Sequence, residues 1–337
     1  MASSLTSPGL RFAANQILMS LHKDIAKVSQ FTTNFTADAA QKGSTLLIPV
    51  ANDASAGDFN RSSNNYGHYQ GSLRYVPMVF DKHKKHSFGF TENDFNLVNG
   101  TSFWQAAGEK SADAVGRAIE GIVAGLITKS TVKTSGIDET TFANENGEIK
   151  TGTGEEFSSA NEVVLGTGDL TLKKVAGLRK ACRDADIPVR DTILALNSVK
   201  FAELLSLLDA HMYGGTDAIR DGLIPNLYGY KAVMELDSLS NTEGENLVGA
   251  LIPSSAIAVA SRTLNVQNPK LYAEIGTVTD EKSGLVLQMR RGGDWTTGDT
   301  VATVECLFGA KLVMPTKVVR LVSAATVSGG STGPTGE

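Results

Sequence analysis

Residues 81–88 read DKHKKHSF, which places Asp81, His83 and His86 within six positions and mixes three lysines among them. Carboxylate and imidazole groups are common ligands of Zn²⁺, and lysine ammonium groups bind phosphates. The stretch therefore offers two kinds of chemistry, a metal site or a contact with nucleic acid. Which of them is possible depends on how the backbone directs the side chains.

Phe80, Phe88 and Phe90, with Gly89 between the last two, favour a strand or turn over a helix here. Side chains alternate along a strand, so His83 lies on one face and His86 on the other. Two histidines on opposite faces are poorly placed to share one metal. We interpret the stretch as a solvated strand. A phosphate contact is the second interpretation, and a metal site is the third.

Sequence signatures of catalysis are missing from the rest of the chain. It contains no GxxxxGK[ST] phosphate loop, no GxSxG elbow and no HExxH helix. Cys182 and Cys306 stand more than a hundred residues apart in apolar contexts, which is typical of small buried side chains. We therefore predict a protein that is not an enzyme and that uses no cofactor, no metal and no catalytic residues.

The composition limits the kinds of partner that the protein can bind. The 337 residues include 31 basic and 36 acidic side chains, a net charge of −5, which argues against a protein that coats nucleic acid. The amino terminus lacks the pattern of a secretory signal. The apolar run at 118–127 contains Glu120 and is far short of the roughly 20 residues that span a bilayer. We expect synthesis in a reducing cytoplasm and no membrane association.

A long polar loop lies between two predicted strands. STLLIPV at 44–50 and SLRYVPMVF at 72–80 have strand character, and the 21 residues between them are rich in Gly, Ser and Asn. A loop of this length inside a compact domain is uncommon unless it is functional or disordered. We predict an extended hairpin that projects from the body and whose tip contacts a neighbouring subunit. The residues that we assign to this contact are Phe59, Arg61, Tyr66, Tyr69 and Arg74.

Residues 101–128 form the strongest predicted helix. Ser102 and Gln105 stand at capping-box spacing, and an apolar stripe predicts one buried face. The stripe consists of Val115, Ile119, Ile122 and Leu126. Other backbone can pack closely on this helix because much of its surface is Ala and Gly.

The stretch 134–169 is strongly acidic. It carries eight acidic residues against Lys150 alone, a net charge of −7, and Asn146-Gly147 indicates a hairpin turn. We interpret it as an exposed acidic insertion, with a weak surface calcium site as the alternative.

A second unit begins at residue 169. Helix, strand and helix patterns follow at 171–187, 191–197 and 198–212, with Ser198 as the expected cap of the last. Further strands are predicted in LIPNLYGYKAVMEL, AIAVASRT, GLVLQMR, DTVATVECLF and AKLVMPTKVVRLV. We expect the last three to form a closing antiparallel sheet.

This order of elements resembles the tailed-bacteriophage major capsid proteins of the Hong Kong 97 fold, over about residues 8 to 322. The local stretches that carry the resemblance are GSTLLIPV, LRYVPMVFDKHKKHSFGFTENDF, DTILALNSVKFAELL, GLIPNLYGYKAVMEL, IPSSAIAVASRTL and LFGAKLVMPTKVVRLV. The resemblance implies an α+β fold. Its segments would be an N-terminal arm at 1–42, an extended loop at 43–90, a peripheral domain with the spine helix at 91–133, the acidic insertion at 134–168, an axial domain at 169–258, a return into the peripheral domain at 259–322 and a flexible tail at 323–337.

The resemblance also implies a function. It predicts a structural major capsid protein that self-assembles, as hexamers and pentamers, into the icosahedral shell of a virion enclosing double-stranded DNA. Its further partners would be a portal protein, a scaffolding or decoration protein, and the enclosed DNA through weak non-specific contact. Synthesis would take place in the cytoplasm of a bacterial host.

Two other functions stay open from sequence. One is an encapsulin-like compartment of the same fold that encloses a cargo enzyme. The other, from a different class, is a metal-dependent hydrolase that uses Asp81, His83 and His86.

Overall fold

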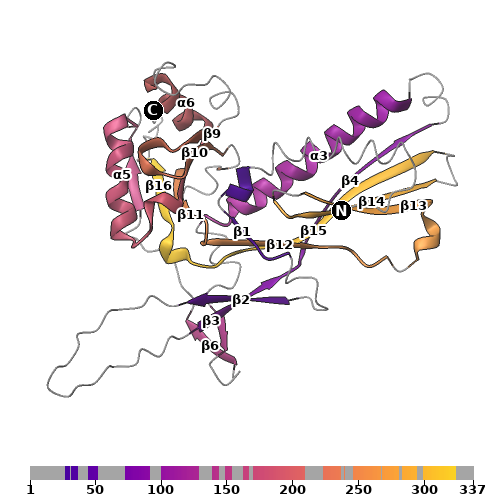
Figure 1. Ribbon diagram of the computed structural model, residues 1–337, viewed down its shortest axis with the longest axis horizontal. Helices are drawn as coiled ribbons and strands as arrows, with labels where there is room; N and C mark the ends of the chain where they lie inside the picture. Colours follow the sequence, from indigo (N-terminus) through magenta and orange to yellow (C-terminus); the bar gives the residue numbers. More distant parts are fainter. Residues whose placement is uncertain are drawn as a thin grey trace, which may run out of the picture.

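The computed structural model sets one long helix against two sheets, with two hairpins at one end (Figure 1). It describes residues 27–30, 32–36, 45–51, 73–91, 100–128, 139–143, 149–153, 162–166, 170–208, 223–236, 239, 246–266, 268–280, 283–293 and 299–323. Within these residues, the strands form two six-stranded sheets and two separate two-stranded hairpins.

The first sheet is built around one long strand, β15. Its members are β1 (Thr32–Asn34), β12 (Ile257–Arg262), β15 (Thr300–Leu312), β14 (Val286–Gly293), β13 (Glu274–Thr279) and β4 (Lys82–Phe90). β4 pairs with one edge of β15, while β14 and β12 share the opposite edge in succession. All of these pairs are antiparallel except that of β1 with β12.

The second sheet is mixed and carries two helices. Its strands, in spatial order, are β7 (Glu162–Leu165), β16 (Val319–Ser323), β11 (Leu247–Pro253), β8 (Thr192–Leu196), β10 (Ala232–Glu235) and β9 (Leu223–Pro225). The helices are α5 (Leu172–Asp184) and α6 (Ser198–Leu207). Short 3₁₀ helices occur at Val189–Asp191, Leu227–Gly229, Pro269–Leu271 and Pro315–Lys317.

Both faces of the second sheet are buried, which explains its uninterrupted apolar strands. In β8 all five residues are buried. Leu194 packs in one core with residues of α5 and α6, while Ile193 packs in another with residues of the long helix. A strand covered on both sides reads as a continuous apolar run rather than an alternating one.

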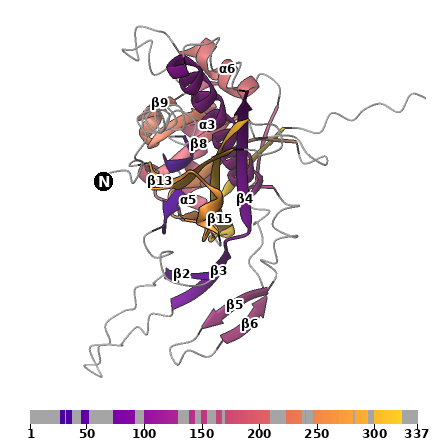
Figure 2. The same ribbon diagram turned by 90° about the vertical axis from the view of Figure 1, so that its right-hand side faces the viewer.

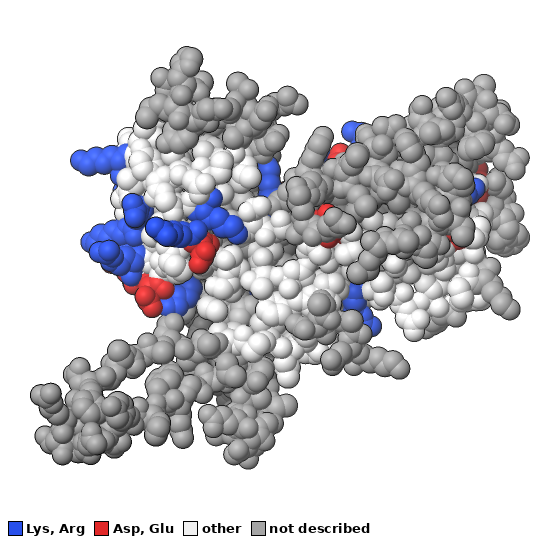
Figure 3. Space-filling view, viewed as in Figure 1, with Lys and Arg blue, Asp and Glu red and all other residues white. Residues whose placement is uncertain are grey.

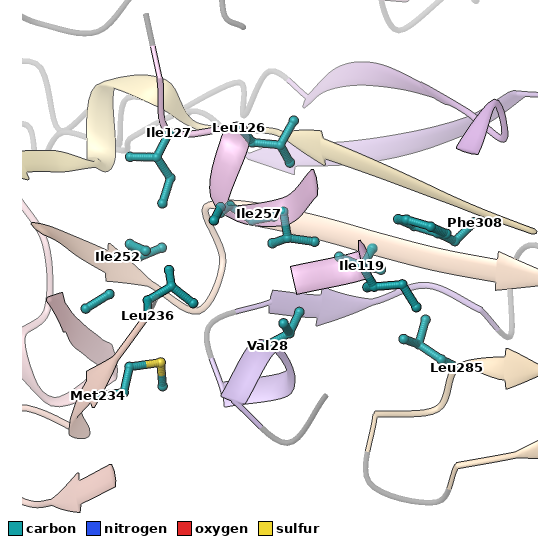
Figure 4. Packing of buried hydrophobic residues seen from close by; sticks show 14 of the residues in the cluster. Val28, Ile119, Leu126, Ile127, Met234, Leu236, Ile252, Ile257, Leu285 and Phe308 are labelled. Carbon is teal, nitrogen blue, oxygen red and sulfur yellow. The ribbon is translucent and has the colours of Figure 1, made fainter. Parts of the chain in front are cut away.

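The long helix α3 (Gly100–Gly125) joins the two sheets through one core. Ile119 on this helix and Phe308 on β15 belong to the same cluster as Met234 on β10 and Ile252 on β11 (Figure 4). Val28, from the residues that precede β1, lies in it too. Each fully buried aliphatic or aromatic side chain contributes about 1.5–3 kcal/mol, so a core shared in this way holds the sheets together.

Two hairpins lie at the same end of the molecule (Figure 2). One is formed by β2 (Thr45–Ala51) and β3 (Leu73–Val79), and the other by β5 (Glu139–Ala143) and β6 (Ile149–Thr153). β5 lies beside β3. The Asn146-Gly147 signal thus correctly predicted a hairpin between β5 and β6.

The structure adds contacts to three predicted segments. Within the range predicted as the N-terminal arm, Val28 is buried in the main core and β1 pairs with β12. Within the range predicted as the acidic insertion, β7 pairs with β16 and Leu165 is fully buried. The stretch AKLVMPTKVVRLV is not one strand of the closing sheet: Ala310–Leu312 ends β15, and β16 crosses to the second sheet.

Two helix boundaries also differ. The long helix ends at Gly125 rather than at residue 128. The cap of α6 is Asn197 and not Ser198, since the Asn197 side chain accepts a hydrogen bond of 2.9 Å from the Lys200 backbone N–H.

Candidate functional site

The two histidines of DKHKKHSF occupy opposite faces of β4, as alternation predicts. His83 Nε2 lies 3.0 Å from Glu305 Oε2 on β15. His86 Nδ1 lies 2.9 Å from the Ser111 hydroxyl on α3. The Asp81 carboxylate is 2.6 Å from the Lys82 ammonium. These residues are therefore used in three separate contacts, and no group of three or more metal-ligating side chains occurs in the part of the chain that the structure describes.

Glu305 is the centre of a polar cluster on the face of the first sheet that is turned away from α3. Its side chain is 4% exposed and forms an ion pair with Arg290 of β14 as well as the contact with His83. Arg290 also lies over the ring of Tyr272, 5.3 Å from its centroid, and donates a hydrogen bond of 3.3 Å to the Tyr272 hydroxyl. Arg290 supplies the counter-charge of the buried carboxylate, and the cluster joins β4, β15 and β14.

A second buried ion pair joins the end of α3 to the second sheet. Arg320 on β16 is 1% exposed and donates hydrogen bonds of 3.1 Å to the Ile127 carbonyl and 2.5 Å to Glu162 Oε1 on β7. Planar guanidinium groups suit such two-directional contacts. Neither Arg320 nor Glu305 was singled out from sequence. The signal that could have found them is a charged residue inside an apolar strand run, in VVRLV and in VECLF.

The residues predicted for the buried face of the long helix lie toward the core. Val115 and Ile119 are buried, Leu126 just beyond the helix is 7% exposed, and Ile122 packs against the same cluster while partly exposed.

The β2–β3 hairpin is anchored by one of its faces. Ile48 and Val50 of β2, with Val76 and Met78 of β3, pack in a small third core against β12 and Val313. The opposite face carries exposed apolar side chains. Leu47 is 53% exposed and Val79 is 50% exposed. An exposed apolar strand face beside a buried one is typical of a surface that another molecule covers.

The predicted tip of this hairpin lies outside the described residues. Phe59, Arg61, Tyr66 and Tyr69 are not described, and for Arg74 the structure gives the backbone position in β3 only. Their assignment to a subunit contact remains a prediction.

Neither of the two buried thiols is an activated nucleophile. Burial raises the pKa of Cys182 to about 11, against smaller opposing effects of a Thr192 hydrogen bond and Arg179, and it raises the pKa of Cys306 to about 12. Thiols with such pKa values carry almost no thiolate near neutral pH, and the thiolate is the reactive form. None of the described helices is long and apolar enough to cross a membrane.

No sequence profile of a known family matches this chain, and no curated protein matches it by sequence. Comparison with solved structures does find matches. The capsid structure of cyanophage P-SCSP1u shares 14% identity with a TM-score of 0.51, over 88% of this chain and 87% of that one. A structure of Mycobacterium phage Ogopogo shares 13% identity with a TM-score of 0.52, over 88% of this chain and 91% of that one. The capsid of a native GTA particle shares 11% identity with a TM-score of 0.51, over 90% of each chain.

These similarities define the fold. The mixed sheets and the few helices form an α+β capsid fold, shared with phage capsid structures over nearly the whole chain. The resemblance to tailed-phage capsid proteins that the sequence suggested is thereby confirmed as a resemblance of fold.

Proposed function

We propose that this chain is the structural subunit of an icosahedral shell that encloses the double-stranded DNA of a tailed phage. The observation that carries the proposal is the capsid fold, which extends over about nine tenths of this chain and of the capsid of the GTA particle. Fold alone is a weak indicator of function, so the surfaces must agree with it.

The surfaces support assembly rather than catalysis. A shell subunit needs segments that reach neighbouring copies, and the β2–β3 hairpin presents an open apolar face at one end of the molecule. It also needs a rigid body to carry them, which the core shared by α3 and the two sheets supplies. The buried charged side chains described above join strands and helices of the body instead of lining a reactive centre.

We assign the roles of the elements from the Hong Kong 97 resemblance. The β2–β3 hairpin is the base of the extended loop, α3 is the spine helix, and the first sheet forms the peripheral domain. The second sheet with α5 and α6 forms the axial domain, and β7 and β16 belong to it. Copies of the subunit assemble into hexamers and pentamers, with a portal protein and a scaffolding or decoration protein as further partners.

Electron microscopy tests the proposal. The chain is expressed alone and together with the genes that neighbour its own, and the products are examined by negative stain. We expect closed particles of uniform size, and in particles from an infected host we expect nuclease-protected double-stranded DNA. A chain that stays monomeric under both conditions contradicts the proposal. Particles that enclose an enzyme and no DNA would instead identify a cargo compartment.

A further inference from the structure

The outer face of α5 is strongly basic in a chain whose net charge is −5. Its exposed side chains include five cations, which we call the basic face: Lys173, Lys174, Arg179, Lys180 and Arg183. Figure 3 shows Lys and Arg gathered over the part of the surface where α5 lies, with few acidic residues among them. Only Asp184 within the helix opposes them, so the helix carries a net charge of +4.

These cations have no ion-pair partner among the residues that the structure describes. None of the five takes part in an ion pair in the described part of the chain, whereas Lys200 and Lys317 nearby are paired with Glu203 and Asp186. Arg179 and Arg183 stand four positions apart, a spacing at which like charges on a helix repel. Two of the five lie in the first turn, where the helix dipole disfavours cations and where α5 has no acidic residue. The face therefore has an electrostatic cost that a bound anionic partner would remove.

The same chain contains an anionic segment whose net charge matches that of the five cations in magnitude. Residues 134–161, which we call the acidic segment, hold six carboxylates and Lys150, a net charge of −5 against the five cations of the basic face. The described part of this segment is the β5–β6 hairpin, which lies beside β3, while α5 covers the second sheet, so the hairpin and α5 lie on different parts of one copy (Figure 1).

We propose that the basic face of α5 binds the acidic segment of a neighbouring copy. This inference rests on the proposed function, since it needs copies that assemble side by side. A contact between two different patches of identical subunits is heterologous, and repetition of such a contact closes a ring when the rotation between copies allows it. The contact would orient neighbouring copies as well as strengthen their association. Complementary charges favour one relative position of the two copies and disfavour wrong pairings.

Nucleic acid is the other polyanion that such a face could bind, and the charges favour a second copy. A chain with a net charge of −5 repels DNA at long range, which the basic face offsets only locally. A second copy, in contrast, provides one acidic segment for each basic face.

A reciprocal charge exchange tests the proposal. The first variant carries K173E, K180E and R183E, and it leaves Arg179 unchanged because this side chain lies close enough to influence Cys182 and Tyr230. A Glu at the start of α5 suits the helix dipole, so this variant should fold. The second variant carries E145K, E148K and E155K in the acidic segment. A control with the same change of net charge, K85E, K110E and R117E, alters exposed cations away from α5.

We expect neither variant to assemble alone at physiological salt, while an equal mixture of the two assembles with a yield roughly ten-fold above that of either, because each then meets a complementary partner. The control should assemble as the unchanged protein does. Particle yield is measured by light scattering and negative stain, and pairwise association in the mixture by analytical ultracentrifugation.

Other results overturn the inference. It fails if the first variant assembles normally, if the mixture does no better than its components, or if the control loses assembly equally. If the first variant assembles but loses affinity for duplex DNA in a filter-binding assay, the basic face belongs to nucleic acid. If the unchanged chain forms no shells at all, the proposed function fails, whereas association of the two variants in the ultracentrifuge still decides whether this contact exists.

Discussion

His83 Nε2 lies 3.0 Å from Glu305 Oε2, and of these two side chains that of Glu305 is 4% exposed and that of His83 is 41% exposed. The two residues are 222 positions apart in sequence, on strands that pair directly. A buried carboxylate is thus approached from the surface by an imidazole and from within the sheet by Arg290. The relationship makes Glu305 a structural residue that joins three strands.

Glu305→Gln should lower the free energy of unfolding by about 2–3 kcal/mol, because it leaves the mostly buried Arg290 without its counter-charge. Urea denaturation followed by circular dichroism measures the change. His83→Gln serves as the control and should cost less than about 1 kcal/mol, since that side chain is largely exposed. Equal losses in the two variants would show that Glu305 is not the centre of the cluster.

Glu162→Gln should also destabilise the subunit, by about 2–4 kcal/mol, since Arg320 keeps its charge in a buried position. Arg320→Lys should be no milder, because an ammonium group cannot reproduce the two-directional contacts to Ile127 and Glu162. Chemical denaturation measures both. The double variant E162V and R320M should lose less stability than the sum of the losses of E162V alone and R320M alone, and strict additivity of those two losses would contradict direct pairing.

Gly309→Ala should loosen the β2–β3 hairpin. An added Cβ would stand 2.6 Å from the Val79 carbonyl oxygen and 3.2 Å from Met78 Cγ, so the base of the hairpin must move away from β15. We expect a loss of about 1–3 kcal/mol in stability and a lower yield of closed particles. Gly121→Ala on α3 is the matched control: its Cβ would meet nothing within 4 Å, and it should gain up to about 1 kcal/mol.

Replacement of Phe59, Tyr66 and Tyr69 together by Ser should leave a folded, soluble subunit that does not close shells. Aromatic side chains dominate the energetics of protein interfaces, and these three have no predicted local core to enter. Negative stain and light scattering measure particle formation, while circular dichroism checks the fold. Normal particles from the triple variant would show that the loop tip is not a subunit contact.

The thiols give a prediction on pH. Burial raises the pKa of Cys182 to about 11 and that of Cys306 to about 12, from an ordinary value of 9.0. At pH 8 neither should react with Ellman's reagent unless the chain is unfolded. Because the unfolded chain releases these protons first, stability should be unaffected below about pH 9 and should fall as the pH rises from there toward 11 to 12. Rapid labelling of the native protein at pH 8 would contradict this.

Local patterns predicted most elements of this fold correctly, but not which sheet each strand joins. The alternation in DKHKKHSF correctly placed His83 and His86 on opposite faces, and the asparagine–glycine pair indicated a hairpin. β16 was assigned to the wrong sheet, because the change of sheet takes place in a turn, Pro315–Lys317, that carries no directional signal. β7 was not predicted as a core strand because it lies in an acidic stretch. Its Glu162 forms an ion pair with Arg320, which is far away in sequence.

Charged residues show the same limit for the candidate site. Glu305 and Arg320 lie in apolar strands, where sequence indicates only that a charge must find a partner. The partner is selected by tertiary pairing over separations of 222 and 158 residues, which a local pattern cannot reveal. The basic face of α5, in contrast, is visible in the sequence once the helix is assigned, because its buried positions are marked by Val175, Leu178 and Cys182.

The separation of β4 from β15 along the chain has a consequence for biosynthesis. β4 is translated more than 200 residues before the strand with which it pairs, and the second sheet likewise waits for β16. Contacts between residues so far apart in sequence form slowly and late in folding. The first sheet therefore cannot close before β15 has been translated, and the second sheet cannot close before β16 has been translated. Until then, the edge of β4 that pairs with β15 has no partner strand, so the order of translation sets the earliest time at which the shared core can form.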